Sequence, residues 1–222
     1  MTKPTGTKLT GPRKGAKSGR GDSLVIFLHG YGADGNDLIG LADPLAQYLP
    51  DTVFLAPNAP ERCTNNPMGY QWAPIPWLDG SSEAAARAGQ DESIALLNAY
   101  LDDVAKAEGI PAARTVLVGF SQGTMMALHV GPRRQEQLAG IVGFSGKLLY
   151  PERLAAEVVT KPPVLLVHGD KDDVVPPANM SEAADALAEN GFEVYTHISK
   201  NTGHGIAQDG LGVALQFLKQ QL

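Results

Sequence analysis

One serine in this sequence has the surroundings of a catalytic nucleophile. Residues 119–123 read GFSQG and fit the pattern G-x-S-x-G, with an apolar run at 115–118 before them and a helical pattern after them. On such a strand–turn–helix the hydroxyl stands above the sheet at the positive end of a helix, and glycines are needed where a Cβ would clash. We therefore predict that Ser121 is a nucleophile. The alternative is a chance pentapeptide in which this serine only caps a helix.

Four histidines follow this serine, and one of them lies where a general base is expected. His129 falls within the helical pattern, His197 within a strand pattern, and His168 at the end of another apolar run. His204 lies in the glycine-flanked segment NTGHG, between the last predicted strand and the last predicted helix. Because sites collect in loops at the carboxyl edge of open α/β sheets, we predict His204 as the base. The alternative is a turn histidine without a catalytic task.

Three aspartates in one loop are candidates for the acid that orients the base. Asp170, Asp172 and Asp173 lie in the segment HGDKDDVVP at 168–176, directly after an apolar run. In enzymes whose nucleophilic serine lies on such a strand–turn–helix, the acid comes between the serine and the histidine in the chain. Its carboxylate holds the histidine in the required tautomer. Residue chemistry alone leaves all three open, because each could be a turn aspartate that bonds its own backbone.

Two backbone N–H groups are predicted to form an oxyanion hole. One belongs to Gln122, the residue after the nucleophile. For the other we predict Tyr31, because the segment LHGYG at 28–32 closes an early strand with two glycines that let backbone N–H groups turn inward. The alternative is that His29 and Gly30 form only the exit turn of a strand.

Strand and helix patterns alternate along nearly the whole chain. Apolar, β-branched runs predict strands at 24–28, 53–56, 115–119, 141–144, 164–167 and 194–198. Helical patterns occupy 37–48, 83–108, 122–130, 151–158, 178–189 and 208–220. This alternation predicts an α/β fold with a mostly parallel sheet and helices on both faces.

One stretch, 57–82, breaks this alternation and is a candidate for substrate binding. It contains five prolines and both tryptophans of the chain, without a clear periodicity. A loop of this length within a compact domain is usually functional or disordered, and its aromatic content argues against disorder. An apolar wall for an acyl chain is predicted from Met68, Trp72, Ile75, Trp77 and Leu78. The alternative is that these side chains cover a sheet edge.

Composition sets the outer limits of this interpretation. The 222 residues fit one domain, 21–222, behind a basic segment, 1–20, that carries six lysines and arginines and no acidic residue. We expect this segment to be partly flexible, or else to add an edge strand at residues 8–10. The rest of the chain is acidic, which argues against a nucleic-acid partner. No apolar run approaches a membrane span or a secretory signal, and a single cysteine suits a cytoplasmic location.

Several motifs together resemble a known family. In chain order they are FLHGYGAD at 27–34, QW at 71–72, GFSQG at 119–123, HGDKD at 168–172 and GH at 203–204. They resemble the landmarks of the small carboxylesterase/phospholipase family, which includes the acyl-protein thioesterases, and the likeness runs from about residue 9 to the C-terminus. The resemblance implies an α/β-hydrolase fold without a large cap domain.

The resemblance also implies roles for particular residues. The family pattern H-G-x-x-D places the acid on Asp172, and other landmarks support Tyr31 and Gln122 as oxyanion donors and Trp72 as part of the acyl-binding loop. Thr124 departs from the pattern, because many relatives carry another glycine at this position, just after the turn that holds the serine.

The predicted function is that of a serine carboxylesterase that cleaves short-to-medium acyl esters through an acyl-enzyme, with no metal or organic cofactor. An acyl-protein thioesterase or lysophospholipase is the alternative, because it could use the same residues. A non-catalytic binding module on this fold is a remote alternative. The expected partner is a small-molecule or lipid-like acyl ester, and exposed apolar residues on an edge strand or last helix could support a homodimer.

Overall fold

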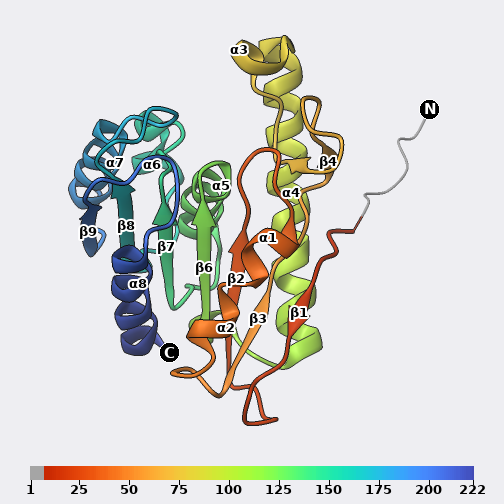
Figure 1. Ribbon diagram of the computed structural model, residues 1–222, viewed down its shortest axis with the longest axis vertical. Helices are drawn as coiled ribbons and strands as arrows, with labels where there is room; N and C mark the ends of the chain where they lie inside the picture. The colour runs from red at the N-terminus through yellow and green to blue at the C-terminus, as the bar shows by residue number, and fades with distance from the viewer. Residues whose placement is uncertain (1–7) are drawn as a thin grey trace.

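The computed structural model describes residues 8–222, and its frame is one seven-stranded sheet. The strand order is β1-β3-β2-β6-β7-β8-β9, and every neighbouring pair is parallel except β1 with β3 (Figure 1). The strands are β1 (Arg13–Lys14), β2 (Ser23–Leu28), β3 (Thr52–Leu55), β6 (Thr115–Phe120), β7 (Gly140–Phe144), β8 (Val164–Gly169) and β9 (Val194–Ser199). All strands predicted from the sequence are present. The central ones are continuous apolar runs buried on both faces, whereas β9 lies at the sheet edge and is partly exposed.

Alternate residues of the central strands enter two apolar cores, one on each face of the sheet. In β2, Leu24 and Ile26 belong to one core, and Val25 and Phe27 belong to the other. The first face is covered by α4 (Glu83–Glu108), α5 (Gln122–Val130), α6 (Pro151–Glu157) and α7 (Ala178–Glu189). The second face is covered by α1 (Gly35–Ile39), α2 (Ala42–Leu45) and α8 (Gln208–Gln221) (Figure 1). Helices on both faces of a mostly parallel sheet confirm the predicted fold class.

The prediction of one helix over 37–48 is wrong, because this segment forms parts of the two short helices α1 and α2. Asp34 begins α1 by accepting hydrogen bonds from the backbone N–H groups of Asn36 and Asp37. Gly40 follows α1, and Pro44 lies within α2. A continuous helix would need an N–H group that proline lacks, and it would press the proline ring against the carbonyl of residue 40.

The proline-rich segment 57–82 contains short elements rather than irregular chain alone. These are β4 (Glu61–Arg62), β5 (Tyr70–Gln71) and α3 (Pro76–Asp79), and β4 pairs with β5 as an antiparallel hairpin. Figure 1 shows α3 at the end of the molecule where α4 begins. A Cβ on Gly89 of α4 would lie 2.9 Å from the Pro74 ring, so helix and segment are in close contact.

The described part of the basic segment lies along acidic side chains of the domain. Strand β1 pairs with β3 at the sheet edge, so an edge strand forms at Arg13–Lys14 rather than at residues 8–10. Arg13 donates two hydrogen bonds of 2.8 Å to Glu108, and Lys8 lies 2.8 Å from Asp103. The predicted flexibility falls partly on residues 1–7, which lie outside the described residues.

Across residues 8–222, no helix combines the length and apolar character that crossing a bilayer requires.

A buried histidine on α5 makes the fold sensitive to acid. His129 is 7% exposed, and its Nδ1 has no hydrogen-bond partner among the described residues. Burial, with a contribution from the nearby Arg133, lowers the pKa of His129 to about 4. The unfolded chain binds a proton on this side chain near pH 6.5, whereas the folded chain does so only near pH 4, so stability is lost as the pH falls between these values.

We predict that His129→Phe makes the free energy of unfolding less dependent on pH between 6.5 and 4. Wild type should lose about 2–3 kcal/mol more than the variant over this window, because only wild type carries the titrating imidazole. Urea unfolding of both proteins at pH 7, 5.5 and 4 measures the difference. Parallel pH dependences would contradict the prediction.

Candidate active site

Ser121 occupies a strained turn between β6 and α5. Its φ is 53° and its ψ is −115°, a conformation that residues with a Cβ rarely adopt. The turn is held where the Ser121 N–H donates a 2.9 Å hydrogen bond to the Phe144 carbonyl at the end of β7. The serine hydroxyl therefore stands at the carboxyl end of the sheet and at the N-terminus of α5, as the sequence predicted.

The two glycines of the motif permit a backbone approach that no side chain would allow. A Cβ on Gly119 would lie 2.4 Å from the Thr124 nitrogen, and a Cβ on Gly123 would lie 1.9 Å from the Leu28 carbonyl oxygen. The second contact packs the first turn of α5 against the end of β2. The predicted reason for both glycines is thus confirmed.

The structure brings Ser121, His204 and Asp172 into one chain of hydrogen bonds. The Ser121 hydroxyl lies 3.0 Å from His204 Nε2, and His204 Nδ1 lies 2.8 Å from Asp172 Oδ2. Because the carboxylate accepts a hydrogen bond from the Nδ1–H, the neutral imidazole presents Nε2 as an acceptor for the serine hydroxyl. This is the arrangement that lets a serine lose its proton as it attacks a carbonyl.

Asp172 is the aspartate of its loop that contacts His204. Its Oδ1 accepts hydrogen bonds from the backbone N–H groups of Val174 and Val175, at 3.0 and 2.9 Å. Burial acts to raise the pKa of Asp172, but the hydrogen bonds from His204 and the two N–H groups outweigh it and hold the pKa below its ordinary value. The carboxylate is therefore ionised at neutral pH, whereas the side chains of Asp170 and Asp173 lie away from His204.

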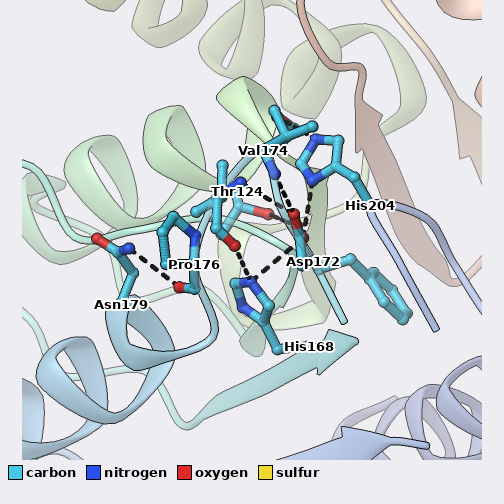
Figure 2. A network of polar contacts seen from close by, with 10 residues as sticks. Thr124, His168, Asp172, Val174, Pro176, Asn179 and His204 are labelled. Atoms are coloured by element: carbon cyan, nitrogen blue, oxygen red, sulfur yellow. Dashed lines mark hydrogen bonds and ion pairs between the residues drawn. The ribbon is translucent and has the colours of Figure 1, made fainter. Parts of the chain in front are cut away.

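The loop that carries His204 is tied to the end of β8. Lys171 N–H donates to the Thr202 carbonyl at 2.9 Å, and a Cβ on Gly169 would lie 2.3 Å from the same oxygen. Since β8 and β9 are neighbouring parallel strands, the loops after them meet at one edge of the sheet. This contact brings His204 above Asp172 (Figure 2).

The predicted oxyanion donors lie on either side of Ser121. In the part of the chain that the structure describes, the Tyr31 N–H has no hydrogen-bond acceptor, and both Gly30 and Tyr31 line the cavity with Ser121. A Cβ on Gly30 would lie 3.3 Å from the Ser121 Cβ, which shows how close the two loops come. Gln122 begins α5, where the first N–H groups of a helix have no acceptor within it.

Two side chains that hold the site together were missed by the sequence interpretation. His29 is fully buried; its Nε2 accepts from the Ala59 N–H at 2.9 Å, and its Nδ1 bonds the Gly30 carbonyl at 2.8 Å. Burial lowers the pKa of His29, which keeps the imidazole in the neutral form that can accept this bond. The histidine that directly follows strand β2 thus fixes the loop of the Tyr31 N–H.

The second missed side chain is that of Gln122. Its carboxamide accepts from the Trp72 N–H and donates to the Ala73 carbonyl, both at 2.8 Å, and so ties the loop of 57–82 to the start of α5. The G-x-S-x-G pattern leaves this position open to any residue, so the motif carries no signal for the contact.

A cavity of about 630 Å³ opens at Ser121 and His204. Most of the predicted apolar wall lines it: Trp72, Ile75, Trp77 and Leu78, together with Met125 and Met126 of α5. Trp72 is almost fully buried, and its indole N–H donates to the His29 carbonyl at 2.9 Å, so it presents little surface to a ligand.

The structure does not place Met68 in this wall, although the sequence suggested it. Met68 lies in the turn of the β4–β5 hairpin, is 81% exposed and does not line the cavity. The turn between β4 and β5 directs the Met68 side chain to solvent.

A second hollow of about 810 Å³ lies between α4 and the segment 131–138 and is lined by none of the predicted site residues. Among the described residues, no group of three or more histidine, cysteine or acidic side chains is arranged to hold a metal ion.

The sheet order and the strand–turn–helix at Ser121 define an α/β-hydrolase fold, and residues 8–222 contain no large cap domain. A family model described as Phospholipase/Carboxylesterase matches residues 15–222. The chain therefore belongs to the phospholipase/carboxylesterase family, and it is a hydrolase of the class that acts on ester or thioester bonds.

Known proteins similar to this chain carry two kinds of name. Acyl-protein thioesterase 1 of Neurospora crassa is 34% identical over 220 residues, covering 91% of this chain and 88% of the relative. Esterase YpfH of Escherichia coli is 27% identical over 199 residues, covering 88% and 82%. The crystal structure of esterase PE8 superposes with a TM-score of 0.92 at 48% identity, covering 97% of this chain and all of that one.

We predict that Gly123→Ala disrupts the site, because its Cβ would lie 1.9 Å from the Leu28 carbonyl and must displace backbone. The expected loss is about 3 kcal/mol in stability, and on the order of 100-fold in kcat/KM from the misplaced serine. Gly212→Ala is the matched control, because Gly212 lies in α8 and a Cβ there would meet no neighbouring group within 4 Å. The control should be about 0.5–1 kcal/mol more stable and fully active. Equal activities of the two variants would contradict this account.

Proposed function

We propose that this chain cleaves acyl thioesters and oxygen esters with Ser121 as nucleophile, His204 as base and Asp172 as the orienting acid. The observation that carries the proposal is the hydrogen-bond chain from Asp172 through His204 to Ser121, with distances of 2.8 and 3.0 Å, at the opening of a cavity. His204 takes the serine proton as Ser121 attacks the acyl carbonyl. The carbonyl oxygen becomes negatively charged and accepts from the Tyr31 and Gln122 N–H groups.

The acyl-enzyme then forms and breaks down. The protonated His204 gives its proton to the leaving sulfur or oxygen as the bond to the acyl carbon breaks, and Asp172 stabilises the imidazolium meanwhile. A water molecule next loses a proton to His204 and attacks the acyl carbon. The bond from the acyl carbon to the Ser121 oxygen then breaks, His204 returns the proton to this oxygen, and the carboxylic acid is released.

Thioesters are the substrates that we favour. The carboxylesterase interpretation from the sequence has support from the esterase name of one similar structure, but several relatives that span most of this chain are named acyl-protein thioesterases. A thiol is also a much stronger acid than an alcohol, so a thiolate leaves with less help from His204. The partly open, partly apolar cavity suits acyl chains of short to medium length.

Matched substrates test this proposal. N-acetylcysteamine thioesters and the corresponding 2-acetamidoethyl oxygen esters differ by one atom, and both can be made with acyl chains of 4 to about 16 carbons. We expect kcat/KM to be about tenfold or more higher for the thioesters and to be greatest at short-to-medium chains. Ser121→Ala should fold and lose activity by at least about 10⁴-fold. Oxygen esters cleaved faster than thioesters, or rates that rise through the longest chains, would contradict the substrate assignment, and an active Ser121→Ala would contradict the mechanism.

A further inference from the structure

A second histidine contacts the carboxylate that pairs with His204. His168, near the end of β8, is 1% exposed, and its Nε2 lies 3.3 Å from Asp172 Oδ2 and 2.8 Å from the Val175 carbonyl oxygen. Figure 2 shows His168 and His204 on different sides of the Asp172 side chain. The sequence assigned His168 no role beyond the end of a strand.

The proton on His168 can be placed from its partners. The Val175 carbonyl can only accept, so the Nε2 at 2.8 Å must carry a hydrogen. The same Nε2 lies 3.3 Å from Asp172 Oδ2, the oxygen that accepts from His204 Nδ1. Because its hydrogen is directed at the Val175 carbonyl, His168 holds the turn whose Val174 and Val175 N–H groups bond Asp172 Oδ1.

We propose that His168 is a positioning residue: by donating to the Val175 carbonyl it holds the turn whose N–H groups bind Asp172, and so it keeps Asp172 on His204. This inference rests on the proposed function. A carboxylate that is held in place keeps the imidazole beside it in the orientation and tautomer that the reaction needs. Loss of the His168 N–H should therefore lower kcat more than it changes KM.

Few other charged groups act on this carboxylate. His168 and His204 are the titratable side chains in contact with Asp172 among the described residues. Lys171 and Asp173 of the same loop are exposed, whereas Asp170 accepts from the Thr202 N–H at 3.3 Å and lies 3.9 Å from Lys200. The neighbouring helices present uncharged side chains, Thr124 of α5 and Asn179 of α7 (Figure 2). Lys147 lines the same cavity from the loop after β7.

Three variants of the full chain test the inference. His168→Phe keeps a ring but removes the N–H, His168→Gln keeps an N–H near the position of Nε2, and His129→Phe removes a buried histidine that does not contact Asp172. For His168→Phe, we expect kcat to fall on the order of tenfold with KM nearly unchanged. His168→Gln should recover most of kcat, and His129→Phe should leave it at the wild-type value. A kcat of His168→Phe equal to that of wild type would overturn the inference.

A measurement on wild type keeps the test decisive if His168→Phe does not fold. With ¹⁵N-labelled histidine, the ring of His168 should carry its hydrogen on Nε2, because this nitrogen donates to the Val175 carbonyl. A His168 ring without a hydrogen on Nε2 would overturn the inference. Activity that depends on Ser121 but not on His168 would end this inference alone, whereas activity in Ser121→Ala would end the proposed function.

Discussion

The site depends on how closely the turn after β6 packs against the end of β2. A side chain at Gly123 would meet the Leu28 carbonyl at 1.9 Å, and this contact between two backbones fixes where α5 begins. The chain that leaves β2 immediately forms the loop with the Tyr31 N–H. One steric constraint therefore sets Ser121 and the Tyr31 N–H, the proposed nucleophile and one proposed oxyanion donor, side by side, and the strained backbone of Ser121 is held by the packing around it.

The parallel sheet supplies the remaining geometry. Loops that follow β6, β8 and β9 all leave the carboxyl edge, so residues far apart in the chain meet there. At this edge, backbone hydrogen bonds position the side chains of the site. The N–H groups of Val174 and Val175 orient Asp172, and the Thr202 carbonyl accepts from Lys171 and so ties the His204 loop to the end of β8. Two buried histidines support the site: His29 bonds the Gly30 carbonyl just before Tyr31, and His168 lies beside Asp172.

The sequence predicted the parts of the molecule that local patterns encode. Buried parallel strands appear as continuous apolar runs, and Ser121 is flanked by glycines that the turn between β6 and α5 requires. Contacts between different loops could not be predicted from local sequence patterns. Residue chemistry alone could not separate Asp172 from two neighbouring aspartates, because its orientation depends on loop backbone donors; the family resemblance selected it. The Gln122 side chain bonds a distant loop, and Met68 lies exposed in the turn between β4 and β5, so local sequence carried no signal for either placement. Pro44 did carry a signal, since its ring forbids the single helix that periodicity suggested.

Reaction with an alkyl fluorophosphonate tests the central claim most directly, because the reagent phosphonylates a serine only where a base activates it and an oxyanion site receives the phosphoryl oxygen. The mass of the intact protein and of its peptides reports how many groups are added and where. We predict one phosphonyl group per chain, on Ser121. No adduct, or an adduct on another side chain such as the buried Ser145, would contradict the claim.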